Sequence, residues 1–257
     1  MRVLLALLLL PAPLLLAQEE KGVVKDLELP AAGTKDPTIV YSVYRATSAK
    51  GDGPFPLILG LHAGRGSAHQ FASILMSVAE GQGAVLDCAQ GFRDVAGAEG
   101  FWWKGDAEEQ AMLDRLLGHV RKTLPVDPKG LTLVGVADGA ELGIKWAVEK
   151  DRGVTGVIAV NLLWRTPGAA KAPRTLKICL MAARDAKEKL VSLSAEAERA
   201  KKAVKAAKYP VVLRIVPGAH NSLFEGWEAE FRKAYEWFDG KLDWPKQLAE
   251  AAKAPEK

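Results

Sequence analysis

The fold is decided by the stretch LTLVGVADGAELG, residues 131–143. Its first half is an apolar run, which a strand buried on both faces of a sheet requires, and its second half begins an amphipathic helix. Gly135 and Gly139 stand two residues before and two residues after Ala137. Glycines so placed are typical of a very tight strand-to-helix turn, because side chains there would collide with neighbouring backbone. We therefore predict a strand, a sharp turn with Ala137 at its tip, and a helix.

The rest of the chain repeats this alternation of strands and helices. Short apolar runs, each typical of a buried strand, begin at Pro56, Gly83, Gly156, Leu176 and Pro210. Amphipathic helices are predicted at 68–80, 108–124, 140–150, 195–208 and 225–238. Segments 21–30 and 38–47 precede them and predict a β-hairpin. The predicted fold class is α/β, with a mostly parallel central sheet flanked by helices and an N-terminal β-hairpin.

Length and composition fit one globular domain. The chain has 257 residues, of which 49% are hydrophobic and 26% are charged, and this excludes the disordered and fibrous classes. The formal net charge is only +4, and the lysines are not gathered with aromatic residues into one stripe, so no nucleic-acid partner is expected. The predicted domain spans 18–245, and the Lys- and Ala-rich tail at 246–257 is expected to fray.

The N-terminal segment MRVLLALLLLPAPLLLAQEE, residues 1–20, has the features of a secretory signal peptide. Arg2 precedes an apolar run, and a small residue, Ala17, ends it. The run is shorter than the ~20 residues that span a bilayer, and two prolines interrupt it. We expect residues 1–17 to be removed, the protein to be secreted or periplasmic, and no stable membrane anchor to remain.

Export to an oxidising compartment would permit a disulfide between the two cysteines, Cys88 and Cys179. Both lie in apolar runs that we place as strands about four sheet positions apart, roughly 19 Å at the usual strand spacing. That separation exceeds disulfide reach. Two buried free thiols are therefore predicted.

Three positions follow predicted strands in the order of a catalytic triad. Ala137 takes the place of the nucleophile. Asp185 follows the strand that begins at Leu176, where an acid would orient the base, and His220 follows the last apolar run, where the base would lie. The glycine-rich turn HAGRG, residues 62–66, offers backbone N–H groups that can bind an oxyanion.

At this point the sequence, from about residue 54 to residue 238, resembles the α/β-hydrolase-fold esterases. The likeness is to the secreted polyhydroxybutyrate depolymerase, feruloyl esterase and dienelactone hydrolase-like group, and it rests on LHAGRG, the VDP turn, GVADG, AARD and GAH. The resemblance implies an α/β-hydrolase fold and carboxylesterase chemistry. Its catalytic positions would be Ala137, Asp185 and His220, and its oxyanion hole would use Ala63, Gly64 and Asp138.

Two departures from that pattern decide the functional interpretation. The families carry Ser or Cys at the position of Ala137, and usually Gly at the position of Ala63. A methyl group cannot attack a carbonyl, and loss of the nucleophile from a measured triad costs about a million-fold in turnover. We therefore interpret the chain as a catalytically degenerate homologue, a pseudoenzyme that binds a small-molecule ester, acyl or glycan ligand in the inherited cleft.

Three alternatives remain open. The protein could be an active hydrolase that uses Asp138, or a water activated by His220, in place of the missing nucleophile. It could be a non-catalytic scaffold that binds a partner through its surface. Finally, Ala137 could be an engineered inactivation of an esterase.

Aromatic residues are concentrated in the Gly-rich loop that follows the second central strand. Trp102 and Trp103, together with His62, are predicted to line a ligand pocket, and the alternative is that the tryptophans pack the loop onto the domain. The four histidines are scattered and lack partners at ligand spacing, so no metal site is predicted. No cofactor is indicated, and the sequence leaves the oligomeric state open.

Overall fold

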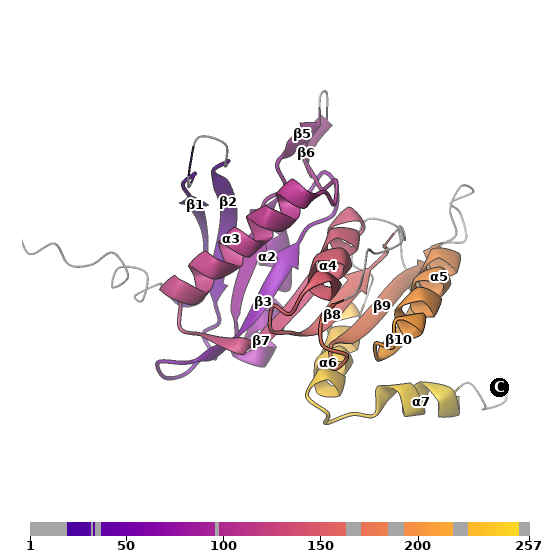
Figure 1. Ribbon diagram of the computed structural model, residues 1–257. Helices are drawn as coiled ribbons and strands as arrows, with labels where there is room; N and C mark the ends of the chain where they lie inside the picture. Colours follow the sequence, from indigo (N-terminus) through magenta and orange to yellow (C-terminus); the bar gives the residue numbers. More distant parts are fainter. Residues whose placement is uncertain are drawn as a thin grey trace, which may run out of the picture.

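A computed structural model describes residues 20–31, 33, 37–95, 98–162, 171–184, 193–217 and 226–251. Its centre is an eight-stranded sheet with the order β1-β2-β4-β3-β7-β8-β9-β10 (Figure 1). The strands are β1 (Val24–Leu29), β2 (Ile39–Arg45), β3 (Phe55–Leu61), β4 (Val85–Ala89), β7 (Val126–Val136), β8 (Val154–Val160), β9 (Lys177–Arg184) and β10 (Val211–Pro217). β2 runs antiparallel to β1 and β4, and the remaining neighbours are parallel. The predicted mostly parallel sheet with an N-terminal hairpin is confirmed.

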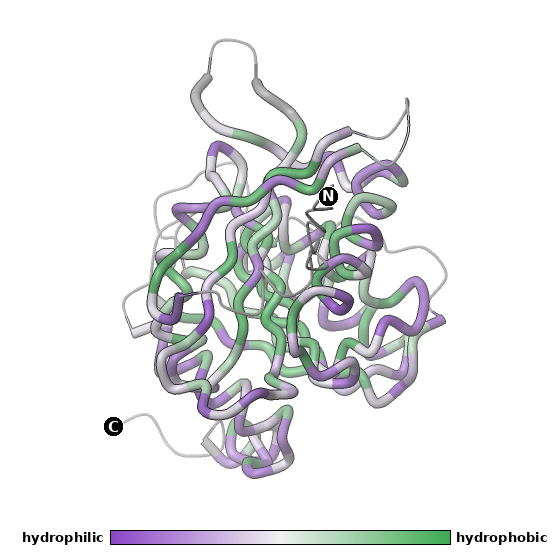
Figure 2. Tube along the Cα trace, turned by 90° about the vertical axis from the view of Figure 1, so that its left-hand side faces the viewer, coloured by the Kyte–Doolittle hydropathy of each residue, from purple (hydrophilic) through white to green (hydrophobic). Residues whose placement is uncertain are grey.

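Helices cover both faces of the sheet. On one face lie α3 (Ala107–Thr123), α4 (Asp138–Glu149) and α5 (Leu193–Ala206), and on the other lie α2 (Ala68–Gln82) and α6 (Trp227–Phe238) (Figure 1). All five residues of β4 and the last six of β7 are buried, as strands covered on both faces require. The hydropathy tube shows apolar residues along the central strands and polar residues on the outer turns (Figure 2).

Two elements lie where the sequence predicted none. A small hairpin, β5 (Arg93–Val95) and β6 (Ala98–Trp102), forms within the expected loop. Helix α7 (Trp244–Ala251) occupies the first part of the segment expected to fray, and it begins before residue 246. Trp244 is only 2% exposed, and Leu248, one turn later, packs against the core, so apolar contact orders this helix.

The two cysteines lie in the interior as free thiols. Cys88 is on β4 and Cys179 is on β9, four positions apart in the sheet order. Burial raises the pKa of both thiols. The prediction of two buried, unlinked cysteines is therefore confirmed.

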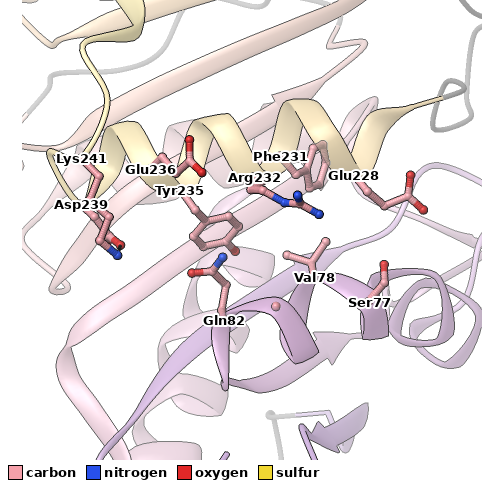
Figure 3. A pocket seen from close by; sticks show the side chains of 11 residues that line it. Ser77, Val78, Gln82, Glu228, Phe231, Arg232, Tyr235, Glu236, Asp239 and Lys241 are labelled. Carbon is pink, nitrogen blue, oxygen red and sulfur yellow. Dashed lines mark hydrogen bonds and ion pairs between the residues drawn. The ribbon is translucent and has the colours of Figure 1, made fainter. Parts of the chain in front are cut away.

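A cavity of about 510 Å³ lies between the C-terminal half of α2 and the length of α6, from Glu228 to Asp239 (Figure 3). Figure 3 shows Tyr235 of α6 pointing toward Gln82 of α2. Charged side chains of both signs line its outer part: Glu228, Arg232, Glu236, Asp239 and Lys241.

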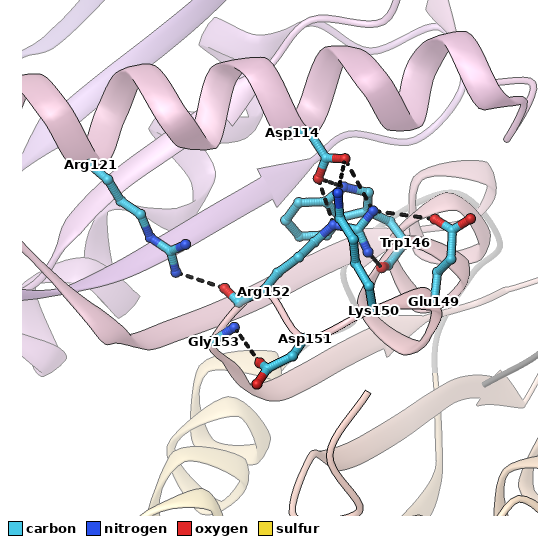
Figure 4. Close-up of polar contacts among 8 residues, drawn as sticks. All are labelled: Asp114, Arg121, Trp146, Glu149, Lys150, Asp151, Arg152 and Gly153. Atoms are coloured by element: carbon cyan, nitrogen blue, oxygen red, sulfur yellow. Dashed lines mark hydrogen bonds and ion pairs between the residues drawn. The ribbon is translucent and has the colours of Figure 1, made fainter. Parts of the chain in front are cut away.

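A polar network fastens α3 to the loop between α4 and β8 (Figure 4). The Arg152 side chain is only 4% exposed, and its Nε donates to Asp114 Oδ1 at 2.6 Å. Trp146 Nε1 and Lys150 Nζ also donate to Asp114, at 3.0 and 2.7 Å. Burial of the Asp114 carboxyl raises its pKa, but the hydrogen bonds from Arg152 and Lys150 outweigh that effect and lower the pKa overall.

Residues 1–17, the predicted signal peptide, lie outside the described residues. Within the part of the chain that the structure describes, every helix is too short or too polar to cross a bilayer.

Candidate active site

The turn between β7 and α4 has the tight geometry that its sequence predicts. Ala137, at the tip, has φ 52° and ψ −118°, a backbone conformation that costs a residue with a side chain about 1–3 kcal/mol. Its N–H donates to the carbonyl of Val160 on β8 at 2.8 Å, and its own carbonyl accepts the N–H of Ala140 at 3.1 Å. The surrounding backbone therefore holds the methyl group of Ala137 at the carboxyl edge of the sheet in a strained position.

The glycines on either side of Ala137 are required by close backbone contacts. A Cβ atom on Gly135 would lie 2.6 Å from the Cα of Ala140. A Cβ atom on Gly139 would lie 2.4 Å from the carbonyl oxygen of His62, in the turn after β3. Both distances are shorter than non-bonded carbon atoms allow, so only glycine lets α4 pack this closely against β3 and β7.

The turn at residues 62–66 lies beside the elbow and is held by the β5–β6 hairpin. Arg65, at φ 68°, donates its N–H to the carbonyl of Phe101 at 2.9 Å, and the Phe101 N–H donates to Gly66 at 3.2 Å. The Trp102 ring covers Gly64, because a Cβ atom there would lie 2.7 Å from Trp102 Cε3. This hairpin therefore fixes the shape of the predicted oxyanion turn.

His62 is a buried, neutral histidine whose two ring nitrogens are both engaged. It is 1% exposed, its Nδ1 donates to the carbonyl of Ala63 at 2.8 Å, and its Nε2 accepts the N–H of Gly91 at 3.1 Å. Burial lowers its pKa, partly offset by the bond to Ala63 and by the negative charge of Asp138. These contacts hold the turn in shape and leave the ring little freedom to bind a ligand.

The Asp138 side chain connects three segments of the chain. Its Oδ1 accepts the backbone N–H of Gly64 at 2.6 Å, and its Oδ2 accepts the backbone N–H of Trp103 at 2.9 Å. Trp103 is 5% exposed, and its Nε1 donates to the carbonyl of His62 at 2.9 Å. These contacts favour the packing alternative for Trp103 over ligand contact.

A cavity of about 480 Å³ opens beside the elbow. Its apolar wall is formed by Phe71 and Ile74 of α2, Val136 of β7 and Trp227 of α6. The turn after β3 also lines the cavity, and Arg65 is the one charged side chain among the described residues that line it. Ile74 is 47% exposed, so part of this large aliphatic side chain is accessible at the cavity wall.

Two predicted site residues, Asp185 and His220, lie outside the described residues. The strands that precede them, β9 and β10, run parallel to β7 and end at the same edge of the sheet as Ala137. Their placement relative to Ala137 therefore stays a prediction.

Sequence reasoning missed two buried polar residues at this edge. Asn161, 1% exposed and at φ 53°, follows β8, and its Oδ1 accepts the N–H of Ala183 at 2.7 Å. Gln90 follows β4, and its Oε1 accepts the N–H of Ala68 at the start of α2 at 2.9 Å. Each is a polar residue directly after an apolar strand, which is the one signal that could have identified it. Among the residues that the structure describes, no cluster of His, Cys, Asp and Glu could hold a metal ion.

Comparison with known proteins agrees on the fold. No family model and no curated protein matches the sequence. An esterase from Pyrobaculum calidifontis has a similar structure, with a TM-score of 0.64, 15% identity and 89% of each chain covered. An S-formylglutathione hydrolase from Agrobacterium tumefaciens aligns with a TM-score of 0.64 and 11% identity over 85% of this chain and 95% of the other. A ferulic acid esterase aligns with a TM-score of 0.62 and 14% identity over 84% and 97%. The chain has the α/β-hydrolase fold, as predicted.

Proposed function

We propose that this protein is an exported, catalytically degenerate homologue of carboxylesterases, which binds an ester, acyl or glycan ligand in the cavity beside the elbow. The observation that carries the proposal is Ala137 at φ 52° and ψ −118°. Such strain is characteristic of a residue that must present its side chain to a ligand, and it persists here around a methyl group. The tight turn that would support a nucleophilic side chain is present, and the residue at its tip is alanine.

The alternative nucleophile, Asp138, is disfavoured by its hydrogen bonds. Each of its carboxylate oxygens accepts a backbone N–H, so attack on a carbonyl would require breaking charge-assisted bonds to Gly64 and Trp103. His220 lies outside the described residues, so hydrolysis by a water that it activates stays a prediction, as does a scaffold function.

The cavity supports the ligand-binding part of the proposal. Its apolar wall suits the acyl or aryl part of a neutral molecule, and its volume of about 480 Å³ lies within the usual range for small-molecule sites. The similar structures include a ferulic acid esterase and an S-formylglutathione hydrolase, whose names refer to very different acyl compounds, an ester of ferulic acid and a formyl thioester. The ligand class is therefore proposed as broadly as esters, acyl groups and glycans.

Two assays on the purified mature protein test this function. We expect no turnover of p-nitrophenyl acetate, butyrate or octanoate above the rate without protein, with an active esterase assayed in parallel. We expect some of a panel of methyl esters and oligosaccharides to change the intrinsic tryptophan fluorescence, because Trp227 lines the cavity. Ile74→Gln should weaken that binding by about ten-fold, since it removes apolar contact at the cavity wall.

The matched control is Val40→Gln, because Val40 is similarly exposed, at 40%, but lies on β2 and is not among the described residues that line the cavity. It should leave binding unchanged. Turnover by the wild type would refute the degenerate assignment, and equal effects of the two glutamine variants would refute ligand binding in this cavity.

Export is the second part of the proposal and has its own test. N-terminal sequencing of the protein recovered from the periplasm or medium of an expressing bacterium should begin at Gln18. A cell-associated protein that retains residues 1–17 would contradict export with cleavage.

A further inference from the structure

The backbone N–H groups of Gly64 and Trp103 form a pair of donors that converge on one carboxylate. Gly64 lies in the turn after β3, Trp103 directly follows β6, and Asp138 begins α4. The donor-acceptor distances are 2.6 and 2.9 Å, and the two donors bond to different oxygens of Asp138. The three residues are far apart in the chain, so the fold itself brings this arrangement together.

We propose that these two N–H groups form an anion-binding site that the chain fills with its own Asp138 carboxylate. The inference rests on the proposed function, because the site adjoins the same cavity: of its three residues, Gly64 lines the cavity beside the elbow. Asp138 thereby takes the place of a ligand's anionic or oxyanionic group. The ligand of the wild-type protein is then a neutral molecule, recognised by the apolar wall and excluded from the two donors.

Physical chemistry favours an occupied site over an open one. Hydrogen bonds from backbone N–H groups to an ionised carboxylate are stronger than those to a neutral acceptor. The Asp138 carboxylate also belongs to the same chain and is held beside the donors by α4. A free anion must therefore compete with a group that is present at high effective concentration. A carboxylate or phosphonate head group would be repelled by the negative charge of Asp138, and both N–H donors would already be hydrogen-bonded.

A purely structural role for Asp138 is the competing explanation, and it makes a different prediction. If the carboxylate only fastens the turn and β6 to α4, its removal lowers stability and creates no new binding. If it fills an anion site, its removal vacates two convergent donors beside an apolar cavity. The variant then gains affinity for an anion with an alkyl chain.

The experiment measures binding of hexylphosphonate by isothermal titration calorimetry at pH 7. The wild type is expected to show no saturable binding, and Asp138→Ala should bind at least ten-fold more tightly than the wild type. The dimethyl ester of hexylphosphonate has no charge, and its affinities for the two proteins should differ by less than two-fold. Asp127→Ala is the matched control, because Asp127 also accepts a backbone N–H, that of Lys129 at 2.8 Å, but lies at the opposite end of β7. It should bind no phosphonate.

Circular dichroism and urea unfolding establish that Asp138→Ala is folded. Should that variant not fold, Asp138→Asn removes the charge at nearly constant size and should show the same gain in a weaker form. The wild type supplies an independent arm, because its Gly64 and Trp103 amide signals in a ¹H–¹⁵N spectrum should not move when hexylphosphonate is added.

Saturable shifts of those two wild-type signals would overturn the proposal, and so would a folded Asp138 variant without gain in phosphonate affinity. The outcome is separable from the proposed function. A gain in phosphonate binding by Asp138→Ala, with no neutral ligand for the wild type, would support the anion site and refute the wild-type ligand. If the wild type binds a neutral ligand and Asp138→Ala gains no affinity for the phosphonate, the proposed function is supported and the anion site is refuted.

Discussion

Ala137 adopts a backbone conformation that L-residues avoid, and the fold enforces it from several sides. Its N–H is bound by Val160, its carbonyl is bound by Ala140, and Gly135 and Gly139 let α4 approach at distances that a Cβ atom would block. Glycine reaches φ 52° and ψ −118° without steric cost, whereas alanine carries about 1–3 kcal/mol of strain there. Neighbouring backbone groups therefore hold a residue with a chemically inert methyl side chain in a strained conformation.

Ala137→Gly should relieve this strain, and Ala140→Gly is the matched control. Both alanines are buried, so both substitutions remove a buried methyl group. Both also increase the entropy of the unfolded chain, because glycine is more flexible than alanine. Only Ala137 is strained, because Ala140 lies within α4. We expect urea unfolding to show Ala137→Gly more stable than Ala140→Gly by about 1–3 kcal/mol. Equal free energies of unfolding for the two variants would contradict the strained elbow.

At the scale of single elements, the strands and helices with strong local patterns were predictable. The apolar run before Gly135 identifies the second half of β7, whereas β7 begins at Val126 and so includes the VDP segment that the sequence predicts as a turn. Helices α2, α3, α4, α5 and α6 each begin within a few residues of the predicted position. The β5–β6 hairpin was not predictable, because its strands are short and Gly100, at φ 96°, packs on the backbone of Arg65. Contact with a distant turn, rather than a local pattern, orders that hairpin.

Of the candidate site, the tight turn at Ala137 and the glycine-rich turn at residues 62–66 were predictable from residues near the ends of apolar runs. The placement of Asp185 and His220 stays a prediction. The position of the Asp138 side chain does not, because its partners Gly64 and Trp103 lie 74 and 35 residues away in the sequence. A pattern within one segment contains no information on which remote backbone groups its side chain will meet.

At the scale of the whole molecule, acid should weaken the fold through carboxylates that join separate elements. Glu80, near the end of α2, accepts the N–H of Thr47 at 2.6 Å and that of Ser48 at 3.1 Å, and it also accepts the hydroxyl of Tyr44 on β2. Burial raises the pKa of Glu80, but these hydrogen bonds outweigh it and lower the pKa to about 2. The pKa of Asp114, in the network that fastens α3, is also lowered. Because the folded state lowers these pKa values, the stabilisation from ionised Glu80 is present above pH 4.5 and is lost as the pH falls toward 2, and the stabilisation from Asp114 is lost in the same direction.

Glu80→Gln tests this linkage, because the amide keeps the size of the side chain and removes its titration. At pH 7 the variant should be less stable than the wild type, since a neutral amide accepts these hydrogen bonds more weakly. Between pH 4.5 and pH 2 the wild type should lose stability more steeply than the variant, so the difference between their free energies of unfolding should shrink. Urea unfolding followed by tryptophan fluorescence across this range measures both slopes.

Glu28→Gln, at an exposed carboxylate on β1, is the control and should parallel the wild type. If the Glu80→Gln curve also stays parallel to the wild type down to pH 2, the bonds from Tyr44, Thr47 and Ser48 do not couple the fold to the ionisation of Glu80.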